Sequence, residues 1–546
     1  MNSIDVALAM LLAVVSSGYL VRMLPFSLPL PLVQIALGAV ISGVFKHGVA
    51  LDPQIFFLLF LPPLLFLAGW RIPKDRLRHD QRAILALALG LVVSTVVGVG
   101  FLIHWMIPAM PVGVAFALAA IISPTDPVAV SSIAARVPIP KRLMHILEGE
   151  SLLNDATGLV CFRFAVAAAM TGGFSLLSAS LTFLWMALVG LAIGVLFTLA
   201  VSFAQRWLSR RVGQETGSPI LISLLIPFGT YLLAERMQAS GILAAVAAGV
   251  TMSRVELSGR LLATTRVQRA AVWSTVQFAL NGIVFVLLGE QLPASLQGAM
   301  ASVAQSGHGN PWWLLVYALT INVGLALLRL LWVWIALRVS LFKARHDSDL
   351  AGTPSWRLLL ATSLAGVRGA ITLAGIMTLP LLLPDGTPLP ARELAIFLAT
   401  AVILLSLLVA SIGLPRLLRG LELTPEPTAL QEENLARRVA AIAAIAAVEQ
   451  SQHELLDKAP TTEIDTYTRA AARVIALYQH WLDENASGED EAWRLRQSDA
   501  AERELRLAAL QGQREAIFDL ARRRRISDEV SRRLVREIDL QEARYR

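Results

Sequence analysis

Residues 119–131 read AAIISPTDPVAVS, an apolar stretch that contains Pro124, Asp126 and Pro127. Each proline removes a backbone N–H donor and disfavours a helical conformation at the residue before it. The stretch therefore predicts two half-helices joined by an unwound segment, with Asp126 balancing the positive end of one of them. Broken helices of this kind build ion sites in the middle of membranes. A proline kink with a satisfied polar cap explains this stretch equally well when it is considered alone.

The next apolar run opens with EGESLLNDATGLV at 148–160. Glu148, Ser151 and Asp155 are spaced i, i+3 and i+7, close to one helical face, with Asn154 beside them. Asp155 lies about ten residues into the run, roughly 15 Å along a helix and near the middle of a membrane. An ionisable residue there costs at least roughly 2.5–3.5 kcal/mol. The pattern favours a functional role for Asp155 over a structural ion pair.

A third unusual run contains SLAGVRGAITLAG at 363–375. Gly366 and Gly369 flank Arg368, and they permit either a close approach of the backbone or a second break. Arg368 lies at a depth similar to that of the two aspartates. This is the twelfth apolar run and Asp126 lies in the fifth, a spacing that fits inverted repeats by geometry alone.

The whole chain has the composition of a membrane protein. Of its 546 residues, 55% are hydrophobic and 16% are charged, whereas soluble domains carry about 25% charge. This composition excludes a disordered chain, a secreted disulfide scaffold and a single soluble enzyme. We predict an all-α polytopic membrane protein with crossed broken helices and inverted repeats. Its thirteen transmembrane helices are expected near 4–24, 30–45, 54–70, 83–107, 112–135, 145–172, 179–205, 218–234, 239–253, 270–289, 312–337, 357–383 and 393–418.

The loops between these runs alternate in charge. Lys and Arg residues follow the third, fifth, seventh, ninth and eleventh runs, whereas the loop after the sixth and the long loop 290–311 hold none. Positively charged loops face the cytoplasm. We therefore expect a multi-pass protein of the plasma (inner) membrane, with the N-terminus outside or periplasmic and the C-terminus inside. An odd number of spans agrees with this orientation.

Two domains are predicted from the distribution of charge. Residues 1–419 hold 28 Lys/Arg and 16 Asp/Glu, and residues 420–546 hold 19 Lys/Arg and 24 Asp/Glu. The second part is rich in Ala, Leu, Glu and Arg, and it reads as a soluble, cytoplasmic, regulatory tail with helices over 428–458, 461–484 and 489–525. Its run Arg522–Arg525 fits either a contact with anionic lipid or an acidic partner, or a solvated helix end.

Six blocks of the sequence carry a resemblance to a known family: FLPPLLF at 60–66, SPTDPVAV at 123–130, EGESLLNDATGLV at 148–160, TYLLAERMQASGILAAVAAGV at 230–250, NGIVFVLLG at 281–289 and AGVRGAITLAG at 365–375. In this order they resemble the monovalent cation:proton antiporters of the NhaP and NHE class, especially the bacterial YjcE-type members with a long cytoplasmic tail. The resemblance covers residues 1–419 and, more weakly, the tail. It implies cation/proton exchange by a transporter, usually a homodimer.

The resemblance also implies roles for individual residues. Asp155 would bind either a proton or a cation, Ser151 and the carbonyl of Thr125 would help to coordinate the ion, and Asn154 would lie beside Asp155. The remaining roles are structural: Asp126, Pro124 and Pro127 in the unwound crossing, Glu150 and Arg368 as a buried ion pair, and Arg329 as a second structural arginine.

One position departs from the family pattern. Relatives often carry an acidic residue in the third span, where this chain has Leu67 and Ala68. If that acid completes the ion site in relatives, a water or another oxygen must replace it here. Arg163, beyond Asp155 toward the outside, either extends harmlessly to the interface or affects the outer approach to the site.

The predicted function is electroneutral, one-for-one exchange of Na⁺, or of Li⁺ or K⁺, for H⁺ in pH and sodium/potassium homeostasis. A desolvated carboxylate favours its protonated form, whereas a bound cation favours its ionised form, so the two compete for one group. Asn154 stands where a second carboxylate would allow a second proton. We expect no cofactor and no nucleic-acid partner. The alternatives are a K⁺-selective antiporter of the same fold and, more remotely, a membrane sensor that signals through its tail. The chain contains no G-x-S-x-G or H-E-x-x-H sequence, so we predict no enzyme.

Overall fold

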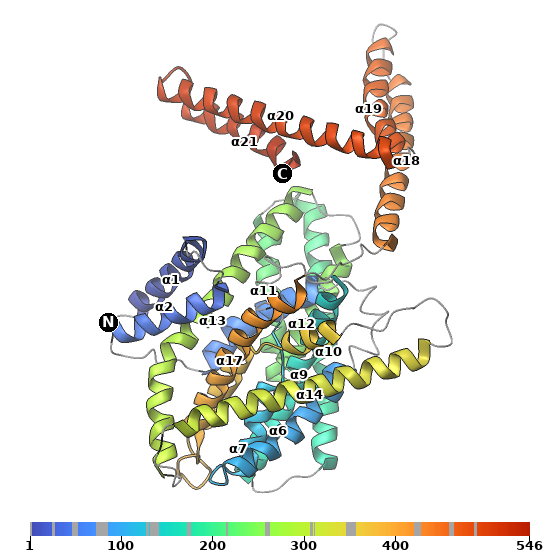
Figure 1. The fold of residues 1–546 in the computed structure, drawn as a ribbon. Coiled ribbons are helices and arrows are strands. Elements are labelled where there is room, and N and C mark those ends of the chain that lie inside the picture. The colour runs from blue at the N-terminus through green and yellow to red at the C-terminus, as the bar shows by residue number, and fades with distance from the viewer. Residues whose placement is uncertain are drawn as a thin grey trace. The chain divides into compact units, whose positions relative to one another are not determined.

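The computed structural model divides the chain into two compact units, Met1–Leu421 and Glu422–Arg546 (Figure 1). Each unit is described by itself. Described are residues 3–23, 28–45, 53–71, 86–126, 130, 141–171, 176–213, 217–256, 263–305, 310, 312–344, 356–419, 427–457, 464–484 and 489–545. Within this part of the chain the secondary structure is helical, apart from one antiparallel bridge between Leu382 and Pro388.

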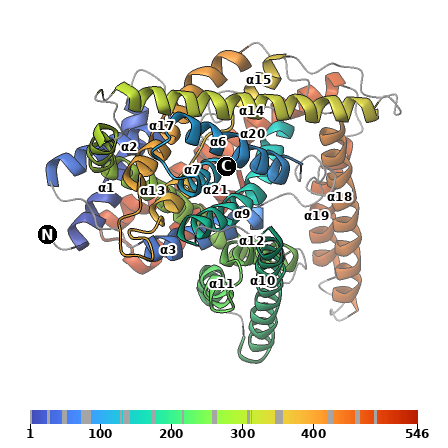
Figure 2. The same cartoon turned by 90° about the horizontal axis from the view of Figure 1, so that it is seen from below.

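The first unit is a bundle of helices. In chain order they are α1 (Ser3–Met23), α2 (Leu30–Phe45), α3 (Pro53–Arg71), the π-helical turn η1 (Ala86–Leu91), α6 (Val92–Met106), α7 (Val112–Ile122), α9 (Lys141–Thr171), α10 (Leu176–Val212), α11 (Gly217–Arg236), α12 (Gly241–Glu256), α13 (Ala263–Gln305), α14 (Trp312–Ala344), α15 (Trp356–Leu364), α16 (Ala370–Met377) and α17 (Arg392–Leu418). α10, α11 and α12 pack together on one side of the bundle, and α14 and α15 lie on the opposite side (Figure 2).

Glycines allow two pairs of helices to pack backbone against backbone. In the contact between α2 and α13, a Cβ atom at Gly38 would lie 1.9 Å from the carbonyl oxygen of Val286. In the contact between α3 and α12, a Cβ atom at Gly249 would lie 2.0 Å from the carbonyl oxygen of Phe66. Small residues are the usual means of bringing helices close together in a membrane, where burial of apolar surface drives little association.

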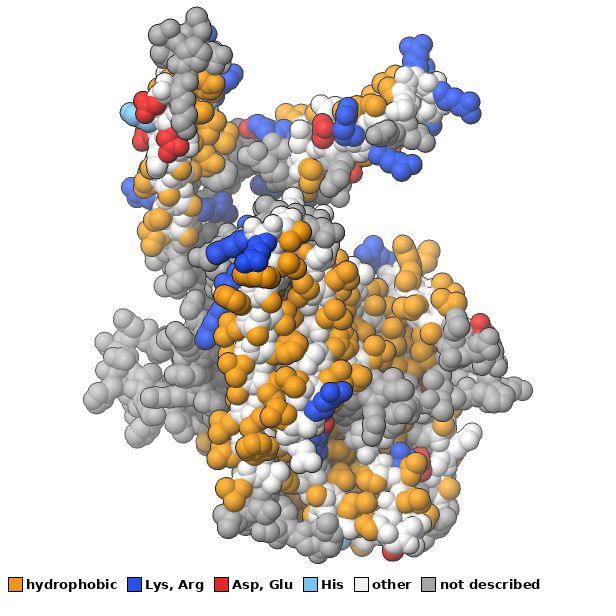
Figure 3. Space-filling model, turned by 180° about the vertical axis from the view of Figure 1, so that it is seen from behind, with side chains coloured by type: hydrophobic (Ala, Val, Ile, Leu, Met, Phe, Trp, Pro, Cys, Tyr) orange, Lys and Arg blue, Asp and Glu red, His pale blue; other side chains and the backbone are white. Residues whose placement is uncertain are grey.

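Hydrophobic side chains cover much of the described surface of this unit (Figure 3). Among the described residues, six helices are long and apolar enough to cross a membrane: Leu89–Met106, Leu184–Val212, Gly217–Arg236, Thr264–Ala301, Trp312–Ile335 and Arg392–Leu418. Shorter apolar helices occupy Ala7–Met23, Leu30–Val44, Leu58–Arg71, Val112–Ile122 and Thr157–Met170. The structure thus has the helical, apolar character expected of a polytopic protein, while thirteen crossings stay a prediction.

One predicted loop is helical. The sequence placed a loop at 290–311, but α13 continues to Gln305 and contains Pro293. Residues 291–305 include four Ala and two Leu, which are good helix formers. Ala299 is fully buried in the main hydrophobic core, and Ser295 is buried as well. Packing of this face extends the helix past the end of the apolar run.

The second unit consists of helices joined in pairs. α18 (Pro427–Leu456) packs against α19 (Ile464–Glu484), and α20 (Glu489–Arg522) packs against α21 (Asp528–Tyr545). The sequence analysis missed α21. Exposed ion pairs at helical spacing, such as Asp465–Arg469, lie along single helices. Arg514 joins α20 to Asp539 and Glu542 of α21, and these carboxylates raise the pKa of its guanidinium above the ordinary value.

Candidate functional site

Two broken helices meet inside the first unit. α7 ends at Ile122, and the backbone is not helical through Asp126; α15 ends at Leu364, and α16 begins at Ala370. The backbone N–H of Asp126 donates a hydrogen bond to the carbonyl oxygen of Val367, at 2.7 Å. We call these two unwound segments, 123–126 and 365–369, together with the buried side chains around them on α9, α14 and α16, the crossing.

Both sequence features that suggested breaks lie at the crossing. α7 ends two residues before Pro124, as the missing N–H donor of this proline predicted. Pro124 itself is buried. Pro127 lies outside the described residues. Gly369 is the residue before α16, and a Cβ atom built on it would lie 1.8 Å from Oδ2 of Asp126. The Asp126 carboxylate therefore lies at the N-terminal end of α16, where the helix dipole favours a negative charge.

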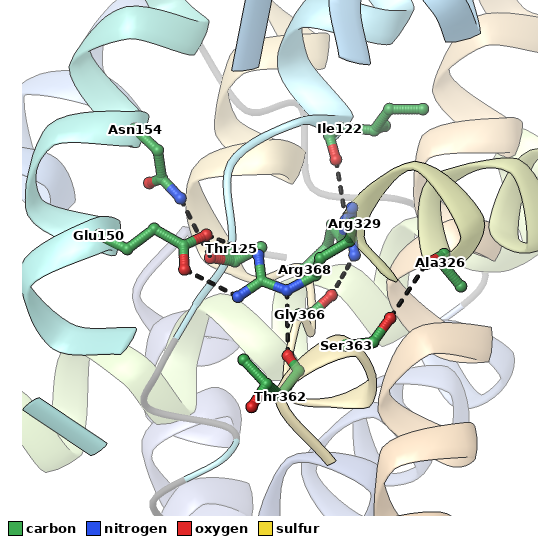
Figure 4. A network of polar contacts seen from close by, with 10 residues as sticks. All are labelled: Ile122, Thr125, Glu150, Asn154, Ala326, Arg329, Thr362, Ser363, Gly366 and Arg368. Atoms are coloured by element: carbon green, nitrogen blue, oxygen red, sulfur yellow. Dashed lines mark hydrogen bonds and ion pairs between the residues drawn. The ribbon is translucent and has the colours of Figure 1, made fainter. Parts of the chain in front are cut away.

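The buried ion pair of the crossing joins Glu150 to Arg329. Oε1 and Oε2 of Glu150 accept hydrogen bonds from Nη1 and Nη2 of Arg329 at 2.5 and 2.8 Å, and each residue is 1% exposed (Figure 4). The sequence analysis paired Glu150 with Arg368, but the arginine hydrogen-bonded to Glu150 is Arg329, and Arg368 is only a neighbouring charge. Arg329 reaches Glu150 from α14 with both terminal nitrogens, the bidentate geometry that makes such pairs strong.

Arg368 is bound to backbone carbonyls instead. Its Nε donates to the carbonyl oxygen of Ile122 at 2.9 Å, and Nη1 donates to the carbonyl oxygen of Gly366. Ile122 is the last residue of α7, so its carbonyl has no partner within the helix. Arg329 acts in the same way on α15, because its Nε donates to the carbonyl oxygen of Thr362 at 3.1 Å. Each arginine thus satisfies a helix end that a break has exposed.

A chain of polar contacts extends from the ion pair toward α9. Oγ1 of Thr125 donates to Oε1 of Glu150 at 3.3 Å, and Nδ2 of Asn154 donates to Oγ1 of Thr125 at 3.0 Å (Figure 4). Oδ1 of Asn154 is buried and has no hydrogen-bond partner. Ser151 is buried on the same stretch of α9. The unwound segment and α9 therefore present several oxygens to one small region.

Asp155 lies in this region with 6% of its surface exposed. Asp126 and Glu150 are its neighbouring charges, and both carboxylates are close enough to repel it. No hydrogen bond reaches its carboxylate from the side chains that the structure describes. One turn further along α9, a Cβ atom at Gly158 would lie 2.4 Å from Cγ of Pro124, which holds this part of α9 directly against the crossing.

The described members of the predicted ion site and scaffold are thus brought together; Pro127 lies outside the described residues. Leu67 and Ala68 behave differently. Leu67 is buried in an apolar cluster with Phe66 and Trp273, and Ala68 is exposed. α3 therefore offers no side-chain oxygen from these two positions.

Arg163 has a partner that the sequence analysis missed. Its Nη2 lies 3.1 Å from Oε1 of Glu235, and the side chains are 44% and 36% exposed. The pair joins α9 to α11. The sequence did contain a signal for this ion pair. Both residues fall near the outer ends of their predicted spans, and their charges are opposite.

Comparison with known proteins identifies the family of this chain. The profile of the transmembrane sodium/hydrogen exchanger family matches residues 9–420. The chain is 41% identical over 539 residues to the uncharacterized Na⁺/H⁺ exchanger YjcE of Escherichia coli (strain K12), covering 98% of this chain and 97% of that protein. It is 43% identical over 415 residues to the sodium, potassium, lithium and rubidium/H⁺ antiporter of Bacillus subtilis (strain 168), covering 75% of this chain and 60% of that protein.

A solved structure supports the fold. The sodium proton antiporter MjNhaP1 from Methanocaldococcus jannaschii at pH 8 superposes with a TM-score of 0.57 at 18% identity, over 77% of this chain and 99% of that chain. Its similarity lies in the fold alone. Together with the profile match and the near full-length relative, it leads to one conclusion: this chain belongs to the sodium/hydrogen exchanger family, whose members are cation/proton antiporters and therefore transporters rather than enzymes.

Proposed function

We propose that this protein exchanges a monovalent cation for a proton at Asp155. The observation that carries the proposal is the balance of charge at the crossing. Among its described side chains, three carboxylates, Asp126, Glu150 and Asp155, face two guanidiniums, those of Arg329 and Arg368. If all five groups are ionised, one negative charge is left without a counter-charge in a buried site. Such a charge is costly unless it is neutralised.

Either of two species can neutralise it. A proton removes the charge from Asp155, and a monovalent cation balances the charge. Both need the same carboxylate, so binding of one displaces the other. The remaining carboxylates are already committed, since Glu150 binds Arg329 and Asp126 lies at the N-terminus of α16. This leaves one exchangeable charge in each cycle and favours electroneutral, one-for-one exchange.

The cation would be held by oxygen ligands around Asp155. The carboxylate, the Ser151 hydroxyl and the Thr125 carbonyl form the proposed set, with Asn154 beside them. Hard cations prefer such oxygen ligands, and no resident cofactor is needed. Na⁺ is the proposed substrate, with Li⁺ and K⁺ as further candidates. A K⁺-selective exchanger is the second candidate, because potassium is among the cations in the name of the Bacillus subtilis relative.

The transport step would move the occupied site from one side of the membrane to the other. α9 and α7 pack against each other and carry the site, whereas α10, α11 and α12 form a separate group on one side of the bundle. Rocking of one group against the other would expose Asp155 alternately to each side. We place the N-terminus outside and the tail in the cytoplasm of the inner membrane, and we expect a homodimer.

Residues 420–546 are proposed to regulate transport. The proposal rests on their charged composition and on their forming a compact unit of their own. A chain truncated near residue 420 is expected to keep cation-dependent proton flux while its rate or pH response changes. Complete loss of flux from a correctly inserted truncated protein would contradict a merely regulatory tail.

Flux through proteoliposomes tests the proposed function. Under an imposed pH gradient, Na⁺, Li⁺ and K⁺ are added in turn to wild-type protein and to Asp155→Asn, with a voltage-sensitive dye present. The proposal predicts cation-dependent proton flux without a voltage signal in the wild type and no flux in the variant. Retained exchange in Asp155→Asn, or in Asp155→Ala, would refute the assignment. A voltage signal would refute electroneutrality.

A further inference from the structure

Three buried side-chain oxygens at the crossing have no hydrogen-bond partner. They are Oγ of Ser123, Oδ1 of Asn154 and Oγ1 of Thr372, and the three residues are 5%, 1% and 1% exposed. Nearly all buried polar atoms in proteins are hydrogen-bonded, so each exception calls for an explanation. Three exceptions within one region suggest a common ligand.

Neighbouring contacts place Thr372 at the crossing. Gly369, Thr372 and Gly375 are spaced three residues apart and share one face of the beginning of α16. At one end of this face, a Cβ atom at Gly369 would meet Oδ2 of Asp126 at 1.8 Å; at the other end, a Cβ atom at Gly375 would meet Cδ1 of Ile121 at 1.9 Å. Thr372 therefore faces the chain between Ile121 and Asp126, the segment that contains Ser123.

The same segment contacts the helix that carries Asp155. Gly158 packs against Pro124, the residue after Ser123, and Asp155 precedes Gly158 by one turn. Asn154 is anchored to Thr125 through Nδ2, which leaves its Oδ1 free to accept. Figure 4 shows the dashed contact between Asn154 and Thr125, and it shows Ile122 accepting a hydrogen bond from Arg368. The two elements that carry these hydroxyls, α16 and the unwound segment, thus both contact the part of α9 just after Asp155, through Leu159 and Gly158.

We infer that Ser123 and Thr372, together with Oδ1 of Asn154, complete the oxygen shell of the cation at Asp155. A dehydrated alkali ion needs several oxygens, and Leu67 and Ala68 of α3 supply none. A proton on Asp155 needs no such shell. The two hydroxyls therefore belong to the cation-bound half of the cycle and act on affinity and on the choice of cation. This inference rests on the proposed exchange at Asp155.

The chain offers a matched control. Thr198 in α10 is also fully buried, and its hydroxyl also has no hydrogen-bond partner. It lies outside the crossing. Comparing Thr372→Val with Thr198→Val separates the loss of an unpartnered hydroxyl in general from the loss of one at the ion site. Thr372→Ser restores a hydroxyl and serves as the rescue variant.

The test measures flux in proteoliposomes as a function of Na⁺, Li⁺ and K⁺ concentration. For Thr372→Val and Ser123→Ala we expect the apparent KM to rise roughly 3- to 10-fold, as for the loss of one polar partner. The increase should differ among the three cations, with the maximal rate largely kept. Thr198→Val should keep the wild-type KM, and Thr372→Ser should regain most of the affinity.

Several outcomes would overturn the inference. An unchanged KM and an unchanged order of cations in Thr372→Val and Ser123→Ala would exclude a ligand role. A loss of maximal rate with a constant KM would indicate a structural role only. An equal rise of KM in Thr198→Val would show that the effect does not depend on a hydroxyl at the crossing. If Asp155→Asn is inactive while these variants behave as wild type, this inference alone fails; if Asp155→Asn still exchanges, the proposed function fails first.

Discussion

The crossing and the C-terminal unit each contain an ion pair between a carboxylate and a guanidinium, but the two pairs lie in different surroundings. Glu150 and Arg329 are each 1% exposed and join α9 to α14 across a large part of the sequence. Asp465 and Arg469 are neighbours on the single helix α19, and their side chains are 72% and 77% exposed. A carboxylate and a guanidinium form both pairs, so the comparison isolates the effect of the surroundings.

The surroundings decide how costly each pair is to break. Removing one partner of a buried pair leaves an uncompensated charge, which is strongly destabilising. Exposed partners return to water when the pair is broken, so such a pair contributes little. In the crossing, the arginines also satisfy the carbonyls that the two breaks expose. Breaking the buried pair should therefore affect stability and transport together, whereas breaking an exposed pair in the C-terminal unit should affect neither strongly.

The largest effect is expected for Glu150→Gln. The change leaves the guanidinium of Arg329 buried without a counter-charge, and we expect a loss of about 3–5 kcal/mol in stability. Thermal unfolding of the purified protein in detergent, measured beside the wild type, checks this value. A loss within about 0.5 kcal/mol of zero would show that the pair is dispensable.

A smaller effect is expected for Gly369→Ala. The added Cβ would lie 1.8 Å from the Asp126 carboxylate, so the two unwound segments must separate. Overpacking of this kind typically costs about 1–3 kcal/mol of stability. The transport rate should fall strongly as well, because the ion site itself is displaced. Gly43→Ala in α2 is the control, since nothing lies within 4 Å of a Cβ atom there. Equal transport by both variants would contradict the close contact.

A third ion pair is intermediate in its exposure. The pair Arg163–Glu235 joins two helices, as Glu150–Arg329 does, but its side chains are partly exposed, like those of the tail. If exposure decides, Glu235→Gln costs about 0.2–1 kcal/mol, and less at high salt. Thermal unfolding of the wild type and of Glu235→Gln at low and high salt measures this loss of stability. A salt-independent loss of several kcal/mol would show that joining two helices matters more than exposure.

The smallest effect is expected for Arg469→Ala in α19. This residue forms a solvent-exposed pair with Asp465 within one helix, which contributes about 0.3–0.5 kcal/mol. Helix content by circular dichroism and proteoliposome flux should both match the wild type. A large drop in either would mean that Arg469 has a second role, for example in contacting a partner.

The comparison also explains what the sequence could predict. Pro124 acts on its own backbone, so the end of α7 could be predicted from local chemistry. Depth along a run placed Asp155 and Arg368 near the same level. Depth alone does not choose between two arginines for one carboxylate, so it could not show that Arg329, rather than Arg368, is hydrogen-bonded to Glu150. The partner of Glu150 depends on the packed helices, in which Arg368 donates to the carbonyl of Ile122 and Arg329 donates to the carbonyl of Thr362.

Other features depend on all neighbours at once. Whether the hydroxyls of Ser123 and Thr372 have partners follows from the packing of α7, α9 and α16 together, and no sequence pattern reports it. The continuation of α13 to Gln305 likewise follows from burial of Ala299 against other helices rather than from the apolar run.

Competition between a cation and a proton for one carboxylate is the central claim, and proton release on cation binding tests it most directly. Na⁺ is added to purified protein in weakly buffered solution near the pH of transport, and the released protons are measured with a pH indicator. The account predicts release of about one proton for each bound cation in the wild type and none in Asp155→Asn. Equal release from Asp155→Asn, or cation binding to the wild type without proton release, would contradict it.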